Sequence, residues 1–202
     1  MQRVAPDRLV EFVSRLDATL RRFAPFDNAA PAPAMLEEAS HELAWLVSED
    51  DWLPDIDRRP SPERYQQYLL YLDPAGRFSV VSFVWGQGQK TPIHDHQVWG
   101  LVGVLQGAEN CQNYSASGDS VKPSAPMRRM GPGDIEILSP MAGDIHHVEN
   151  ALTDRPTVTI QVYGADIGKV ERWVYAPTAP RKRFVSGYSN GPDNPPFQLP
   201  AA

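Results

Sequence analysis

The spacing of apolar side chains near the amino terminus predicts two helices. Between residues 6 and 24 ("PDRLVEFVSRLDATLRRFA"), apolar residues recur at spacings of three and four, the period of one face of an α-helix: Leu9, Val10, Val13, Leu16, Leu20 and Phe23. A second stretch of the same kind runs from about residue 33 to residue 48. We therefore expect residues 1–55 to form an N-terminal helical part.

The pattern changes after Pro54, and from residue 64 to residue 175 the apolar runs shorten to strand length. Turn signals separate these runs: "DPAG" at 73–76, "GQGQK" at 86–90, "SASGDS" at 115–120 and "GPGD" at 131–134. Short strands without helices between them are typical of a sandwich or barrel rather than of a parallel sheet. We expect a mainly β protein with its barrel at residues 64–175. A proline-rich tail at 176–202 should be extended or irregular and pack over the outside.

Length and charge narrow the class of protein. A chain of 202 residues has room for one sizeable core, so we expect residues 1–202 to form a single domain. The net charge of −6 argues against a nucleic-acid partner, which would need clustered Lys and Arg. No apolar run is long enough to cross a bilayer, and Asp7, Glu11 and Asp17 stand where a signal peptide would be apolar. We expect a cytoplasmic protein without a membrane partner, as a monomer or a weak homo-oligomer.

Cys111 is the only cysteine of the chain. A single cysteine excludes an intrachain disulfide and a zinc site with several thiolates. We expect Cys111 to be a small, half-buried apolar side chain rather than a catalytic thiol.

Four of the five histidines fall into two clusters, "PIHDHQVWG" at 92–100 and "PMAGDIHHVEN" at 140–150, each in a strand-like segment. Side chains alternate between the two faces of a strand, so His94 and His96 should point to the same side. If that side faces the interior, the pair forms a two-point metal chelate.

His146 and His147 are adjacent, so in an extended segment they face opposite ways and only one of them can join the first pair. A single histidine is usually an ordinary core or surface residue, but this combination favours a metal site with three imidazole ligands. Such ligands suit Fe, Zn, Cu and Ni, and the spacing does not choose among these metals. Three neutral ligands leave the charge of a divalent ion uncompensated, which favours an additional anionic ligand.

These segments resemble the two sequence motifs of the cupin superfamily. The first, G-x5-H-x-H-x3,4-E-x6-G, is matched by Gly88, His94, His96 and Gly107, with Gly100 or Leu101 at the glutamate position. The second, P-x-G-x2-H-x3-N, is matched with one extra residue by Pro140, Gly143, His146 and Asn150. The resemblance implies a jelly-roll-like cupin β-barrel, and its register selects His146 rather than His147 as the third ligand.

Three histidines without the glutamate make the chain similar to the cysteine dioxygenase family of thiol dioxygenases. Further matches lie within residues 64–175: "RYQQYLLY", "FVWGQGQKTPIHDH", "HHVEN" and "TIQVYGAD". The resemblance implies Fe(II) as the cofactor, held by His94, His96 and His146. It also implies the oxidation of a thiol to a sulfinic acid with both atoms of O2.

The element Tyr65-Gln66-Gln67 resembles the Gln-type bacterial subgroup of that family, because mammalian-type enzymes carry an arginine at the position of Gln67. This subgroup is similar to 3-mercaptopropionate dioxygenases. The resemblance implies that Gln67 and Arg172, in "GKVERWVY", hold the carboxylate of a small mercapto-carboxylic acid. We expect 3-mercaptopropionate or L-cysteine as the substrate, with O2 as the second small-molecule partner.

The chain departs from the family beside the iron. Family members usually carry a Ser-x-His-x-Tyr element there, and the matching positions are Thr159, Gln161 and Tyr163. The resemblance implies that Tyr163 donates a hydrogen bond to oxygen or substrate, held by Gln161 and Thr159. Gln161 cannot exchange a proton near neutral pH as histidine does, which affects rate or substrate choice. Two alternatives stay open: another metal-dependent cupin enzyme, and a non-catalytic cupin that binds a small ligand.

Overall fold

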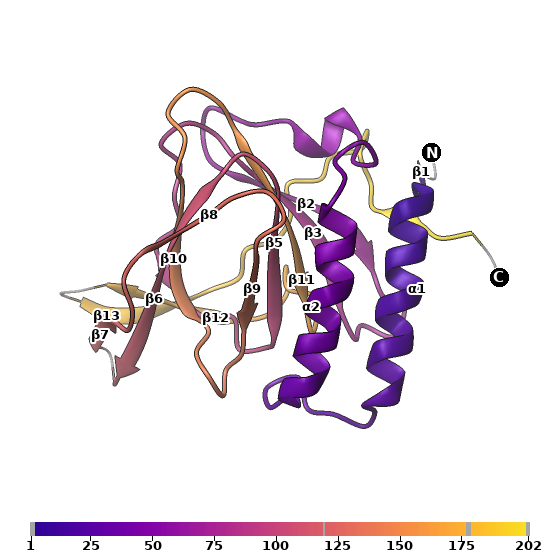
Figure 1. Ribbon diagram of the computed structural model, residues 1–202. Helices are drawn as coiled ribbons and strands as arrows, with labels where there is room; N and C mark the ends of the chain where they lie inside the picture. The colour runs from indigo at the N-terminus through magenta and orange to yellow at the C-terminus, as the bar shows by residue number, and fades with distance from the viewer. Residues whose placement is uncertain (1–2, 119, 177–178, 201–202) are drawn as a thin grey trace.

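Two helices lie side by side against one face of a curled β-structure (Figure 1). The structure, a computed structural model, describes residues 3–118, 120–176 and 179–200. Helix α1 spans Asp7–Arg22 and α2 spans Pro33–Val47, followed by a short 3-10 helix, η1, at Asp55–Arg58. Both helices begin and end within about two residues of the ranges predicted from the apolar spacing. None of the helices in these described ranges is long and apolar enough to cross a membrane.

The helices cover a five-stranded antiparallel sheet. Its strand order is β2 (Gln66–Leu72), β3 (Ser79–Trp85), β11 (Thr157–Tyr163), β5 (Gly100–Gln106) and β9 (Ile135–Leu138). Helix α2 packs on β5, where Gly103 allows close approach: a Cβ atom on Gly103 would lie 3.1 Å from Cγ of Leu43. The central strands β3 and β11 are buried along their whole length, because the helices cover one face and a second sheet faces the other.

The second sheet closes the other side of the barrel. Its strand order is β13 (Ala179–Phe184), β12 (Arg172–Ala176), β4 (Ile93–His94), β10 (Ile145–Asn150), β6 (Glu109–Ser117) and β7 (Ser120–Pro123), and β8 (Arg128–Met130) also pairs with β6. The proline-rich tail therefore contributes a regular strand, β13, antiparallel to β12. The guanidinium groups of Arg181 and Arg183 lie over the ring of Trp173, at 4.2 and 4.9 Å from its centroid, which fixes β13 on β12.

The two ends of the described chain meet on the helix side. Strand β1 (Arg3–Val4) pairs in parallel with β14 (Phe197–Gln198). The mainly β barrel with N-terminal helices that the sequence predicts is confirmed.

Alternation along β11 separates two apolar clusters. Val158, Ile160 and Val162 belong to the cluster between the helices and the first sheet. The alternate residues Thr159, Gln161 and Tyr163 face the barrel interior, where Tyr163 packs in the second cluster. A polar stripe on an otherwise apolar strand is thus directed into the barrel, toward the second sheet.

Candidate metal centre

Three imidazoles meet inside the barrel. His94 on β4 and His146 on β10 are directly opposite each other in neighbouring strands. Their ring centroids are 4.9 Å apart, and that of His96 lies 4.9 Å from His94 and 4.8 Å from His146. All three side chains are buried, and their candidate ligand atoms lie within 4.8 Å of one another. The structure therefore brings together the three histidines named from the sequence.

The local backbone differs from the expected continuous strand. Strand β4 ends at His94, so His96 lies just beyond it rather than two places along the same strand. The side chain of Asp95 accepts hydrogen bonds from the backbone N–H of Trp173, at 2.8 Å, and from the hydroxyl of Tyr175, at 2.9 Å. These bonds anchor the segment to β12 and hold the His96 ring on the same side as His94 without strand pairing.

The Nδ1 atom of each imidazole already has a neighbour. The partners are the Pro92 carbonyl at 3.0 Å for His94, the Asp144 carbonyl at 2.8 Å for His96, and Oε2 of Glu136 at 3.4 Å for His146. Metal-binding histidines are typically oriented in this way, with the other ring nitrogen free for the ion. Nε2 of His96 is buried and has no hydrogen-bond partner among the described residues, which an ion between the three rings would supply. The residues present fit a metal ion.

Burial also favours the form of the imidazoles that binds a metal. It lowers the pKa of His94 and of His96 well below 6.5, and repulsion from His146 and Arg172 lowers both further. Both rings are therefore neutral at pH 7, so a metal ion does not have to displace a proton from a charged imidazole.

His147 is turned away from this group. Its Nδ1 lies 2.7 Å from the carbonyl oxygen of Thr91, and its Nε2 lies 3.6 Å from Oε2 of Glu149. The alternation of side chains along β10 thus places His146, and not His147, beside His94 and His96.

A hydrogen-bonded chain of side chains on β11 lies next to the histidines. The hydroxyl of Tyr163 donates to Oε1 of Gln161, and Nε2 of Gln161 donates to Oγ1 of Thr159 at 3.1 Å. The ring of Tyr163 stacks on that of His96, with centroids 5.4 Å apart. Burial raises the pKa of Tyr163, so its hydroxyl keeps its proton and remains a donor at neutral pH.

Gly100 is the position that faces the site where the cupin motif has its glutamate. A Cβ atom on Gly100 would lie 3.0 Å from two ring carbons of Tyr163, whereas Leu101 packs in the cluster beneath the helices. The absence of a side chain at Gly100 therefore makes room for the ring of Tyr163.

Arg172 places a buried positive charge near the histidines. Its side chain is 3% exposed, its Nη2 donates to Oγ of Ser186 at 2.7 Å, and its guanidinium lies 4.6 Å from the ring centroid of Phe184. Among the described residues it forms no ion pair with a carboxylate, and its Nε is buried without a hydrogen-bond partner. A buried guanidinium of this kind favours an anionic ligand.

Gln67 lies at the rim of a small cavity near Arg172. The cavity has a volume of about 230 Å³, and Tyr65, Gln67, Ser186 and Tyr188 are among the residues that line it. Ser186, which accepts from Arg172, connects the guanidinium to this cavity. Arg172 is not itself among the residues that line this cavity, and its link to Gln67 runs through Ser186.

Two further side chains at the site were not recognised from the sequence. Cys111, expected to be half-buried, is 2% exposed, and its thiol donates to the carboxylate of Glu136 with Sγ–O distances of 3.1 and 3.3 Å. Its Sγ also lies 3.6 Å from Nδ1 of His146. Cys111 is therefore a neighbour of the histidine group, although it lies outside both histidine motifs in the sequence.

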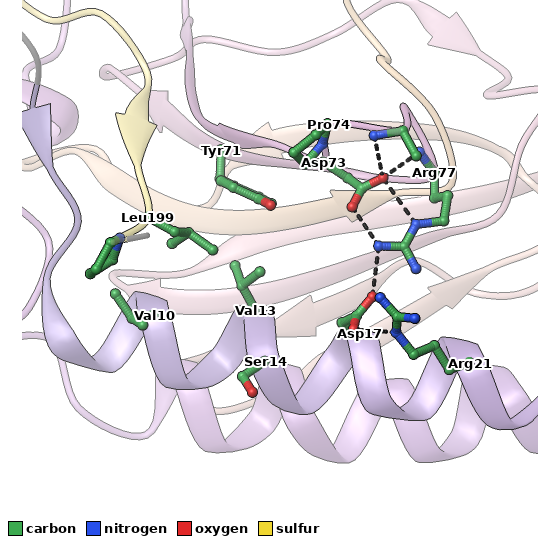
Figure 2. Close-up of a pocket in the computed structure, with 12 residues that line it drawn as sticks. Val10, Val13, Ser14, Asp17, Arg21, Tyr71, Asp73, Pro74, Arg77 and Leu199 are labelled. Atoms are coloured by element: carbon green, nitrogen blue, oxygen red, sulfur yellow. Dashed lines mark hydrogen bonds and ion pairs between the residues drawn. The ribbon is translucent and has the colours of Figure 1, made fainter. Parts of the chain in front are cut away.

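A second polar cavity lies on the helix side of the first sheet (Figure 2). It has a volume of about 430 Å³ and is lined by residues of α1, β2, the turn that follows β2 and the C-terminal segment at Leu199 and Pro200. Its charges are already paired: Arg77 binds Asp73 at 2.5 Å and Asp17 of α1 at 2.6 Å, as the dashed lines in Figure 2 show. This cluster ties α1 to the turn after β2 and lies outside the barrel interior.

Comparison with known proteins gives distant likenesses. No protein-family model matches the chain. It is 19% identical to an uncharacterized protein with a double-stranded β-helix domain from Klebsiella pneumoniae, over 60% of this chain and 93% of that one, with a TM-score of 0.47. It is 14% identical to a cupin superfamily protein from Desulfitobacterium hafniense, over 54% of this chain and 84% of that one, with a TM-score of 0.41. It is 20% identical to a polyketide cyclase from Streptomyces resistomycificus, over 52% of this chain and 68% of that one, with a TM-score of 0.40.

Proposed function

We propose that this protein is a non-haem Fe(II) thiol dioxygenase. It oxidises the thiol of a small mercapto-carboxylic acid, 3-mercaptopropionate or L-cysteine, to the sulfinic acid with O2. The observation that carries the proposal is the buried group of three imidazoles beside a buried guanidinium that has no carboxylate partner among the described residues. The sequence resemblance to the cysteine dioxygenase family, and to its Gln-type subgroup in particular, supports the same reaction.

The metal would be held by Nε2 of His94, His96 and His146, the ring atoms that the Nδ1 contacts leave free. Ferrous iron bound there supplies the redox chemistry that joins O2 to sulfur. The reaction balances as R–SH plus O2 giving R–SO2H: sulfur loses four electrons, O2 takes them up, and no external reductant is consumed.

The charges around the site favour a substrate with two negative groups. Three neutral imidazoles leave the charge of the ion uncompensated, and Arg172 adds a positive charge that is 3% exposed. A thiolate and a carboxylate on one small molecule complement both charges. 3-Mercaptopropionate carries only these two groups, whereas L-cysteine adds an ammonium group that Arg172 repels. We therefore expect 3-mercaptopropionate to be the better substrate of the two.

The remaining contacts orient the substrate and a proton donor. Gln67 contributes an amide to the cavity that Ser186 also lines, and Arg172 donates to Ser186 from behind; we propose that both residues hold the carboxylate. Oγ1 of Thr159 accepts from Trp85 at 3.3 Å as well as from Gln161, which fixes the amide so that its oxygen faces Tyr163. Tyr163 thus holds a protonated hydroxyl beside His96, and this one proton would turn from Oε1 of Gln161 to an oxygen atom of the reacting group.

The test is O2 consumption by the protein loaded anaerobically with Fe(II). We expect uptake with 3-mercaptopropionate and L-cysteine, weaker uptake with cysteamine, which lacks a carboxylate, and one sulfinate formed per O2. Zn(II)-loaded protein and free Fe(II) are the controls. Absence of uptake above these controls with 3-mercaptopropionate, L-cysteine, cysteamine and mercaptosuccinate rejects the dioxygenase. Tight binding of these thiols without turnover would favour a non-catalytic ligand-binding cupin.

A further inference from the structure

A second group of possible metal ligands lies on the opposite edge of the His146 ring from Nε2. Cys111 on β6, Glu136 on β9 and Nδ1 of His146 on β10 form this group, and all three side chains are buried. Sγ of Cys111 lies 3.6 Å from Nδ1, and Oε2 of Glu136 lies 3.4 Å from Nδ1 and 3.1 Å from Sγ. The thiol dioxygenase reaction proposed above uses neither Cys111 nor Glu136.

The spacing of these atoms is close to that of three corners of a tetrahedral zinc site. Zinc bonds of about 2.3 Å to sulfur and about 2.0–2.2 Å to nitrogen and oxygen place neighbouring ligand atoms about 3.3–3.6 Å apart. Two of the three separations, 3.6 Å for sulfur–nitrogen and 3.4 Å for oxygen–nitrogen, fall at these values. The third, 3.1 Å between Sγ of Cys111 and Oε2 of Glu136, is about 0.4 Å shorter than these bond lengths require, so the carboxylate would move outward by that amount when a cation binds. Thiolate, imidazole and carboxylate are also the ligand types that zinc prefers.

Access and charge at this group suit a cation. Cys111 and Glu136 line a surface cavity of about 470 Å³, which can supply a water molecule as the fourth ligand. Arg128 lies 3.5 Å from Glu136, and its side chain is 53% exposed and also donates to Sδ of Met130 at 3.3 Å. Both carboxylate oxygens of Glu109, on the same strand as Cys111, are buried and have no hydrogen-bond partner among the described residues.

We propose that Cys111, Glu136 and Nδ1 of His146 form a second metal site, for a thiophilic divalent cation such as Zn(II), with water as the fourth ligand. The site shares His146 with the three-histidine centre but does not depend on the reaction proposed there. With that centre empty, His146 carries its proton on Nε2, and binding releases one proton, from the Cys111 thiol. With both sites filled, His146 bridges them as an imidazolate and a second proton is released.

Cobalt(II) is the probe for this site, because a thiolate ligand gives Co(II) a charge-transfer absorption in the near ultraviolet. Cys111 is the only cysteine, so in a buffer without thiols this absorption can come from no other residue. We expect the absorption in the full-length wild-type protein and its loss on addition of Zn(II). It should be absent from Cys111→Ser and persist in the double variant His94→Ala/His96→Ala, which lacks two ligands of the other centre. That double variant separates the two proposals, since it loses iron and O2 uptake but keeps the absorption.

Glu136→Gln provides a second measurement that leaves the cysteine in place. We expect it to weaken Co(II) binding by about tenfold or more, in line with the loss of one anionic ligand. Glu149→Gln, on the same strand as His146, is the matched control and should leave the affinity unchanged. Folding of each variant is checked by circular dichroism. Absence of the charge-transfer absorption in folded wild-type protein at saturating Co(II), or an unchanged affinity in Glu136→Gln, overturns the proposal.

Discussion

The phenol ring of Tyr163 lies nearly parallel to the imidazole of His96, with an angle of 18° between the planes and 5.4 Å between the centroids. The tyrosine hydroxyl is therefore held beside the candidate metal ligands by ring stacking as well as by its hydrogen bond to Gln161. Stacking and hydroxyl chemistry can be separated by substitution, because phenylalanine retains the ring.

Tyr163→Phe should lower kcat for thiol-dependent O2 uptake by about tenfold to a hundredfold, the effect of losing one hydrogen bond of about 1.5–3 kcal/mol to a charged group. Iron content should stay at the wild-type level, because His94, His96 and His146 are untouched. The measurement is steady-state O2 uptake normalised to bound iron. Tyr114→Phe, on the β6 strand, is the control and should behave as the wild type. An unchanged kcat in Tyr163→Phe would remove its hydroxyl from the reaction.

His146→Ala should abolish stoichiometric Fe(II) binding, whereas His147→Ala should retain it. The physical reason is the alternation along β10, which directs His146 toward His94 and directs His147 toward the carbonyl of Thr91. Iron bound per chain after anaerobic reconstitution and desalting is the measurement. The reverse result, with iron lost only in His147→Ala, would show that the ligand assignment is wrong.

Arg172→Ala should raise KM for 3-mercaptopropionate by about tenfold to a hundredfold, since a charge-assisted contact contributes about 1.5–3 kcal/mol. KM for cysteamine, which has no carboxylate, should change little or decrease. Arg155→Ala is the control, because the Arg155 side chain is 65% exposed and faces only Asp154, at 4.0 Å, among the charged groups of the described residues. Equal effects of Arg172→Ala on both thiols would exclude Arg172 from carboxylate binding.

Arg77→Ala should lower the free energy of unfolding by about 1–3 kcal/mol, because it leaves the buried carboxylate of Asp73 without its partner. Burial alone raises the pKa of Asp73, but the hydrogen bonds and charge of Arg77 outweigh burial and hold it below the ordinary value of 3.8. A carboxyl whose pKa is lowered on folding stabilises the fold above its unfolded pKa, and this stabilisation is lost as the pH falls through the folded pKa.

The wild-type protein should therefore lose stability on acidification below about pH 4. The part of this loss that comes from protonation of Asp73 should be smaller in Arg77→Ala. Urea unfolding at several pH values measures both effects. Arg21→Ala is the control, because the one carboxylate that Arg21 pairs with in the described part of the chain is Asp17 and its side chain is 72% exposed. Its effect should stay below about 0.5 kcal/mol.

Helices and strand faces could be predicted from the sequence, because apolar and polar residues repeat along them with a regular spacing. Apolar spacings of three and four located α1 and α2, and the period of two along β11 places Thr159, Gln161 and Tyr163 on one face. The pairing of β4 with β10 joins segments far apart in the sequence and follows no local period. The two histidine clusters still indicated it, because imidazoles from both clusters can bind the same metal ion.

The contact between Cys111 and Glu136 could not be predicted in this way. Cys111 lies opposite Val148 in one sheet and Glu136 lies opposite Val102 in the other, so they meet only because the barrel closes. The alternation of polar and apolar residues in β9 would predict that Glu136 is exposed and Ile137 is buried. In β9 the carboxylate of Glu136 is 3% exposed, while the neighbouring Ile137 is 44% exposed, the reverse of an ordinary amphipathic strand.

The close contact between Gly100 and Tyr163 makes any side chain at position 100 compete with the tyrosine ring for space. A Cβ atom there would lie 3.0 Å from two ring carbons, so the ring would have to shift by a few tenths of an ångström to admit it. The longer side chain of Gly100→Glu should therefore disturb the stack of Tyr163 on His96. A fourth, carboxylate ligand at this position would come at the expense of the tyrosine's present placement.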